Sequence, residues 1–310
     1  MNTAALSTRR PLDSFAVMLM IVLCAIWGFQ QVAIKSTNAA LAPMFQAGVR
    51  SAIATVLVWA WARSQRTPLF RDDGTLGAGL LAGVLFAGEF ICIFIGLTLT
   101  SASRMAVFLY TAPCFTALGL HAFVAGERMR RPQWIGIGTA FAGMALAFAD
   151  GFARTPTPGS SMLTGLIGDA LGVLAGILWA ATTVVVRATK LSHSSASKTL
   201  FYQLAVSAVV LLALAFLLGE GQVHRVTPLA VASLAYQAVI VAFVSYLTWF
   251  WLLKRYMASR LSVFSFLTPL FGVSFGVLLL GESFSVRFLL AAGLVLAGIL
   301  MVNSPTRQKP

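Results

Sequence analysis

The amino-acid sequence predicts an all-α integral membrane protein with ten transmembrane helices, arranged as two inverted five-helix repeats. Three observations support this fold class. Of the 310 residues, 59% are hydrophobic and only 10% are charged, whereas soluble domains have about 25% charged residues. The apolar residues gather in runs that short polar segments separate. One twelve-residue segment also occurs twice, once in each half of the chain.

The repeated segment covers residues 102–113 (ASRMAVFLYTAP) and returns at residues 258–269 (ASRLSVFSFLTP), with six of twelve positions identical at one constant offset. A Gly-Glu pair follows each copy, at Gly126-Glu127 and at Gly281-Glu282. Two halves of the same apolar pattern are typical of duplicated membrane domains. We therefore expect an internal duplication.

Crossing the hydrocarbon core of a bilayer takes about 20 residues in a helix. The first run follows a polar segment with Arg9 and Arg10, a pattern that signal peptides share, but further runs follow, so we interpret it as a retained helix. The expected spans are 14–34, 41–62, 76–99, 105–125, 132–150, 164–186, 199–219, 228–253, 261–280 and 287–303. The first repeat then covers 14–150, a Thr/Pro/Gly/Ser-rich linker covers 151–163, and the second repeat covers 164–303.

The distribution of Lys and Arg predicts the orientation. Sixteen of them fall on the face that carries the two termini, and six on the other, namely Lys35, Arg50, Arg104, Arg154, Arg225 and Arg287. Cytoplasmic loops carry the excess of basic residues, so both termini are expected in the cytoplasm. Five spans per half is an odd number, so the second half enters the membrane from the opposite side and the repeats are inverted.

The paired Ala-Ser-Arg…Pro segments, each followed by Gly-Glu and a glycine-rich last helix, resemble the EamA repeat of the drug/metabolite transporter superfamily. The Trp27-Gly28 pair fits the same pattern, and the resemblance covers about 15–150 and 165–303. It implies ten helices in two inverted repeats around a central cavity. It also implies outward transport of amino acids, other metabolites or drugs, and the sequence is most similar to bacterial aromatic amino acid exporters of that family.

Pro113 and Pro269 occupy matching positions inside the fourth span of each half. Proline removes a hydrogen bond from a helix and clashes with the preceding turn. Paired interruptions in two halves are typical of the substrate site or of a bend used in gating. A packing kink without a role in transport is the alternative.

Glu89 lies near the middle of its span, with no charged residue within a dozen positions on either side in the sequence. A carboxylate at that depth is costly and is expected to face a cavity or a partner. Two hypotheses follow: a residue that binds a proton or a substrate ammonium, or a carboxylic acid that is hydrogen-bonded between helices.

Small organic ligands are held by apolar walls with a few convergent polar groups. Amide and aromatic side chains within the spans are therefore the other candidates, although some aromatic residues belong to interfacial belts. With Glu89, the cavity candidates are Trp27, Gln30, Gln46, Tyr110, Trp179, Tyr202, Gln203, Tyr246 and Trp249. Glu127, Glu282, Asp169, Arg104 and Arg260 lie near span ends and are interpreted mainly as pairing or capping residues.

The expected function is a secondary transporter of the bacterial inner membrane that exports aromatic and other neutral amino acids by alternating access. A multidrug or quaternary-cation exporter, or an exporter of other metabolites, is the alternative on the same fold. A carrier of phosphate esters is disfavoured because the deep positions hold amides and aromatics. The sequence has no catalytic constellation, phosphate-binding loop or metal-ligand spacing, so we expect neither an enzyme nor a cofactor. The expected partners are a small-molecule substrate, membrane lipid and, as an open option, protons, with no nucleic acid.

Overall fold

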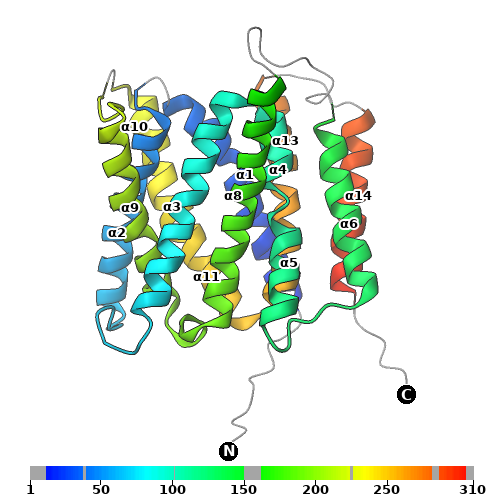
Figure 1. The fold of residues 1–310 in the computed structure, drawn as a ribbon, viewed down its shortest axis with the longest axis horizontal. Coiled ribbons are helices and arrows are strands. Elements are labelled where there is room, and N and C mark those ends of the chain that lie inside the picture. The colour runs from blue at the N-terminus through cyan, green and yellow to red at the C-terminus, as the bar shows by residue number, and fades with distance from the viewer. Residues whose placement is uncertain are drawn as a thin grey trace, which may run out of the picture.

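The computed structural model describes residues 12–37, 40–100, 102–149, 162–223, 226–280 and 286–304. Its helices stand side by side in one bundle (Figure 1), which confirms the all-helical class. All but the last two residues of the expected linker, that is residues 151–161, and Glu282 lie outside the described residues.

The helices follow the expected apolar runs closely. In the first half they are α1 (Ser14–Thr37), α2 (Pro43–Ser64), α3 (Leu76–Leu99), α4 (Ala102–Leu109), α5 (Ala112–Phe123) and α6 (Arg131–Ala147). In the second half they are α8 (Met162–Ala188), the 3-10 turn η1 (Lys190–His193), α9 (Ala196–Leu217), α10 (Pro228–Ala235), the π-helix η2 (Tyr236–Ser245), α11 (Tyr246–Arg255), α12 (Ala258–Ser262), the 3-10 segment η3 (Val263–Phe266), α13 (Leu267–Leu280) and α14 (Val286–Asn303).

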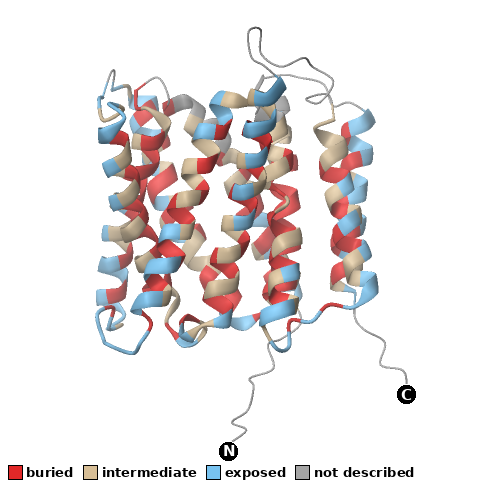
Figure 2. Cartoon of the chain, in the orientation of Figure 1, coloured by how far each residue is buried: buried red, intermediate tan, exposed pale blue. Residues whose placement is uncertain are grey.

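Seven helical stretches among the described residues are long and apolar enough to cross a membrane, and a shorter apolar stretch covers Ser14–Gln30. The helices α2 and α6 coincide with two further expected runs but are not among these seven. Large apolar side chains such as Leu217 and Val209 are exposed on the outside of the bundle, where Figure 2 shows the least buried helix faces. An apolar outer surface of this extent suits a lipid environment, so the chain is a multi-pass membrane protein.

Both spans that carry the repeated segment are interrupted near their proline. The first breaks at Tyr110 and Thr111, between α4 and α5, and Pro113 stands in the first turn of α5. In the second, the 3-10 segment η3 comes before α13, in which Pro269 is the third residue. Proline lacks the donor that a continuous helix needs at these places. Each interruption therefore lies just before or at the matched proline.

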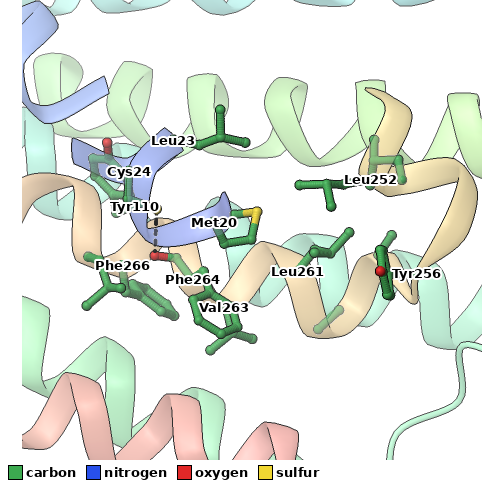
Figure 3. Close-up of a cluster of buried hydrophobic side chains, with 14 of the residues drawn as sticks. Met20, Leu23, Cys24, Tyr110, Leu252, Tyr256, Leu261, Val263, Phe264 and Phe266 are labelled. Carbon is green, nitrogen blue, oxygen red and sulfur yellow. Dashed lines mark hydrogen bonds between the residues drawn. The ribbon is translucent and has the colours of Figure 1, made fainter. Parts of the chain in front are cut away.

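The first helix of each half packs against the other half. Helix α1 contacts η3 and α13, and Figure 3 shows Met20 and Cys24 of α1 on the side that faces Phe264. The Cys24 thiol donates to the Phe264 carbonyl at 3.2 Å. Helix α8 packs in the same way against α3, α4 and α5. The two halves are thus interlocked through α1 and α8.

Two aspartates reinforce this packing at opposite ends of the bundle. Asp169 of α8 accepts hydrogen bonds from Thr100 Oγ1 at 2.8 Å and Arg104 Nε at 3.1 Å, and forms an ion pair with Arg104. Asp13, just before α1, accepts from the Tyr256 hydroxyl at 2.8 Å. Asp13 and Asp169 are 156 positions apart, as are Thr100 and Tyr256, and this is also the offset of the repeated segment. In Figure 1, α1 begins at the lower edge and α8 at the upper edge.

The loop between α2 and α3 is tied to α9 by a further pair. Lys198, a buried residue of α9, donates to the carboxylate of Asp73 at 2.9 Å and to the Arg71 carbonyl at 2.8 Å. The Thr75 hydroxyl and the Lys198 ammonium lower the pKa of Asp73 to about 2. Because this pKa is lowered on folding, the pair stabilises the folded state above pH 3.8 and loses its effect as the pH falls toward 2.

Helices α6 and α14, the last of each half, form a close pair whose backbones meet at Gly136 and Gly298. A Cβ added at Gly298 would lie 2.4 Å from the Gly136 carbonyl oxygen and 2.5 Å from the Ala140 nitrogen, whereas one at Gly293 would meet open space. Because backbone atoms cannot yield as a flexible side chain can, we expect Gly298→Ala to lower the stability of the protein by about 1–3 kcal/mol. Gly293→Ala, on the same helix, is the matched control.

Thermal unfolding of both variants in detergent, followed by tryptophan fluorescence, checks this expectation. A similar melting temperature for Gly298→Ala and Gly293→Ala would contradict the close packing of α6 against α14.

Candidate functional site

A cavity of about 140 Å³ lies inside the bundle. Six spans surround it, three from each half: α1, α3 and the α4–α5 break, and α8, α9 and η2–α11, with one further residue from α13. The lining residues are Trp27, Gln30, Phe86, Glu89, Phe90, Ile93, Leu109, Tyr110, Trp179, Thr182, Thr183, Gln203, Tyr246, Trp249, Phe250 and Thr268. A water molecule needs about 10–15 Å³ of such space, so the cavity has room for about ten waters or a ligand of similar size.

Aromatic rings hold one another in place around this cavity. The Trp27 ring packs edge-to-face against Trp249 and Tyr246, with centroids 5.9 Å and 6.5 Å apart. The Trp27 indole N–H donates to the Ser245 hydroxyl at 2.9 Å, at the end of the π-helix η2. Tyr110 and Trp179 form a second edge-to-face pair at 5.7 Å. Rings fixed by such contacts make a preformed apolar wall.

Few polar groups interrupt this wall. Glu89, Gln30 and Gln203 are all buried, and Gln203 Oε1 has no hydrogen-bond partner among the described residues. The Thr182 hydroxyl, by contrast, is used within its own helix, because it donates to the Leu178 carbonyl at 2.9 Å. A buried acceptor without a partner costs free energy, so Gln203 and Glu89 are the groups best able to accept from a polar ligand.

The structure brings together eight of the ten cavity candidates from the sequence: Trp27, Gln30, Glu89, Tyr110, Trp179, Gln203, Tyr246 and Trp249. Gln46 and Tyr202 do not line the cavity. Gln46 is buried in α2. The Tyr202 ring lies against Gly79 of α3, at a close contact between α3 and α9, and 5.8 Å from Lys198 Nζ. The Tyr202 side chain thus serves packing between helices in this structure.

Arg50 requires a correction of the sequence analysis, which counted it among the basic residues of the outer face. It lies in the second turn of α2 and is only 1% exposed. Its guanidinium carbon stands 4.5 Å from the centre of the Phe90 ring. It also interacts electrostatically with Glu89. The acid that is isolated in the sequence therefore has a basic neighbour in space, and the deep positions are not only amides and aromatics.

The sequence contained the signal for Arg50. The residue lies nine positions inside the expected span 41–62, and a cation at such a place is expected to face a partner or a cavity. Its assignment to the outer face concealed this.

Glu127 is the centre of a deeply buried polar cluster outside the cavity. Its carboxylate forms an ion pair with Arg187, at the end of α8, and the two side chains are 2% and 1% exposed. It also accepts from the backbone N–H groups of Ala258 and Ser259 at 2.9 Å and 3.0 Å, and from the Ser259 hydroxyl at 2.6 Å. The expected role of Glu127 as a partner for an arginine and a helix N-terminus is confirmed.

The comparisons with known proteins agree with this architecture. The model of the EamA-like transporter family matches the chain twice, at residues 14–149 and 166–304. This chain belongs to the EamA-like transporter family. It is therefore a membrane transporter of the drug/metabolite superfamily.

The relatives of this chain are distant but match more than nine tenths of its length. A protein of Salmonella typhimurium named "Probable amino-acid metabolite efflux pump" is 26% identical over 93% of this chain and 93% of its own length. The protein of the same name from Escherichia coli is 26% identical over 91% and 92%. "Uncharacterized transporter YoaV" of Bacillus subtilis is 25% identical over 92% and 96%. A solved crystal structure covers 94% of this chain with a TM-score of 0.78 at 19% identity, which supports the fold alone.

Proposed function

We propose that this transporter exports amino acids, aromatic ones included, from the cytoplasm across the bacterial inner membrane. The observation that carries the proposal is the aromatic-lined cavity with a buried carboxylate, which is large enough for about the dozen non-hydrogen atoms of an amino acid. The names of the Salmonella and Escherichia relatives support the substrate class and the direction. Larger dyes or drugs would need a wider cavity than this one.

The mechanism that we propose is alternating access between two inverted five-helix repeats, 14–150 and 164–303, with ten spans and both termini in the cytoplasm. The support comes from the equal offset of the two aspartate contacts, Asp13–Tyr256 and Asp169–Thr100, at opposite edges of the bundle. Each contact joins one half to the other. A relative movement of the halves would break one and keep the other. Pro113 and Pro269, beside the two interruptions, are the proposed bends.

Glu89 is the proposed site for a substrate ammonium or a coupling proton. It lines the cavity, and the groups that interact with it are Arg50 of α2, Cys92 of its own helix, Tyr110 at the α4–α5 break and Tyr246 of α11. A carboxylate that changes its protonation when substrate arrives would couple export to a proton gradient.

Efflux from liposomes tests the proposed function. The purified protein is reconstituted into liposomes loaded with labelled phenylalanine or threonine, and efflux is followed with and without an imposed pH gradient. We expect efflux above that of protein-free liposomes, with inhibition by excess unlabelled amino acid. Trp249→Ala, which removes a ring from the cavity wall, is expected to lower this efflux about tenfold or more. Trp59→Ala, an exposed residue on the outside of α2, is the control.

Absence of amino acid efflux, together with movement of a quaternary-cation dye by the same vesicles, would replace the substrate class by the multidrug alternative. An efflux rate that does not change with a pH gradient of either direction would contradict proton coupling and would indicate facilitated export.

A further inference from the structure

Arg50 is a buried cation with incomplete hydrogen bonding. Two of its guanidinium nitrogens, Nε and Nη2, have no hydrogen-bond partner among the described residues. The charge rests instead over the Phe90 ring, at 4.5 Å from the ring centre. A cation–π contact of this kind offsets only part of the desolvation cost of a buried charge, so Arg50 needs an anionic counterpart.

Glu89 is the acidic neighbour of Arg50. It immediately precedes Phe90 on α3, and the two side chains interact electrostatically. The three ion pairs of 4.0 Å or less among the described residues do not include them. Glu89 lines the cavity, as do Phe90 and Tyr246, the rings that contact or interact with Arg50. Arg50 itself is not among the lining residues. The two side chains are thus neighbours without direct pairing, with Glu89 at the wall of the cavity and Arg50 beside the rings of that wall.

The charge balance of this pair distinguishes between ligand classes. A zwitterion can place its ammonium on Glu89 and its carboxylate on Arg50, so that each buried charge gains a partner. A cation would satisfy Glu89 and leave Arg50 without a counter-charge, and an anion would do the reverse. Leaving one buried charge unpaired is strongly unfavourable. A site with one charge of each sign therefore favours ligands that carry one of each.

We propose that Arg50 and Glu89 together select zwitterionic ligands, with Glu89 binding the ammonium group and Arg50 the carboxylate of an α-amino acid. The inference rests on the proposed function, because it names the chemistry of the same cavity. In the structure the guanidinium carbon lies over the Phe90 ring, while Nε and Nη2 have no hydrogen-bond partner among the described residues, so both can donate charge-assisted hydrogen bonds to a carboxylate.

Three ligands with the same ring and nearly the same chain test this pair: phenylalanine, phenethylamine and 3-phenylpropionate. Their binding to the purified full-length protein at pH 7 is measured by quenching of tryptophan fluorescence and by calorimetry. The wild type is expected to bind phenylalanine at least about tenfold more tightly than either other ligand. In Arg50→Gln we expect the ratio of the affinity for phenethylamine to that for phenylalanine to rise at least about tenfold. In Glu89→Gln we expect the corresponding ratio for 3-phenylpropionate to rise by a similar factor. Arg63→Gln, an exposed arginine of the same helix, is expected to change none of the three affinities.

The outcomes separate this inference from the proposed function. If the wild type binds none of the three ligands, the amino acid function itself is wrong. If it binds phenylalanine but Arg50→Gln weakens all three ligands equally, the pair is overturned while the function stands. If Arg50→Gln does not fold, two other variants test the pair: the charge-balanced double variant Arg50→Gln/Glu89→Gln and the single variant Glu89→Gln. The double variant is expected to lose the preference for the zwitterion, and an unchanged preference in both would overturn the pair.

Discussion

Replacement of Glu127 by alanine is expected to lower the free energy of unfolding by about 3–5 kcal/mol, because it leaves the Arg187 charge buried without a counter-ion. The same change removes the acceptor of two backbone N–H groups at the start of α12 and of the Ser259 hydroxyl. Glu127 thus connects the loop between α5 and α6 to the end of α8 and the start of α12.

Thermal and denaturant-induced unfolding in detergent measures this effect. Glu220→Ala is the matched control, because Glu220 is a partly exposed acid between α9 and α10 in none of the ion pairs among the described residues. The double variant Glu127→Met/Arg187→Met removes both charges and is expected to be less destabilised than the sum of the two single changes. Additive effects of the two single changes would show that the ion pair contributes little.

The sequence predicted the helices well because every span is a long apolar run with polar ends, and this pattern needs no tertiary information. The repeated segment likewise indicated where the two spans break, at Thr111 and before Pro269. The sequence did not predict the π-helix η2, because Tyr236–Ser245 has the composition of an ordinary apolar span. The wider turn there places Ser245 where it accepts from Trp27, a long-range contact that local pattern cannot show.

The site was less predictable than the spans, because a run that is apolar on all faces does not determine the rotation of its helix. Gln203 and Tyr202 are neighbours in the sequence, and both were candidates for the cavity. Only Gln203 lines it, since Tyr202 packs against Gly79. The proximity of Arg50 and Glu89 depends in the same way on how α2 and α3 are rotated, which packing against α9 decides.

Loss of either aspartate contact is expected to loosen one edge of the bundle and leave the other intact. Asp169→Asn replaces an ion pair and two hydrogen bonds to Arg104 and Thr100 at the edge where α8 begins. Asp13→Asn weakens the contact with the Tyr256 hydroxyl at the edge where α1 begins. Hydrogen bonds to charged groups contribute about 1.5–3 kcal/mol each. Under alternating access, Asp169→Asn should therefore favour the state that is open at its own edge by about tenfold or more, and Asp13→Asn the opposite state.

Amide hydrogen exchange of the full-length protein in nanodiscs measures both edges at once. In Asp169→Asn we expect faster exchange where α3 meets α4 and in the first turns of α8, and in Asp13→Asn where α11 meets α12. Asp72→Asn, an exposed acid of the α2–α3 loop, is the control. If either variant accelerates exchange equally at both edges, the aspartates only stabilise the bundle as a whole. A response confined to one edge in each variant would mean that two positions related by the repeat offset act in opposite directions on a single equilibrium, as an inverted duplication requires.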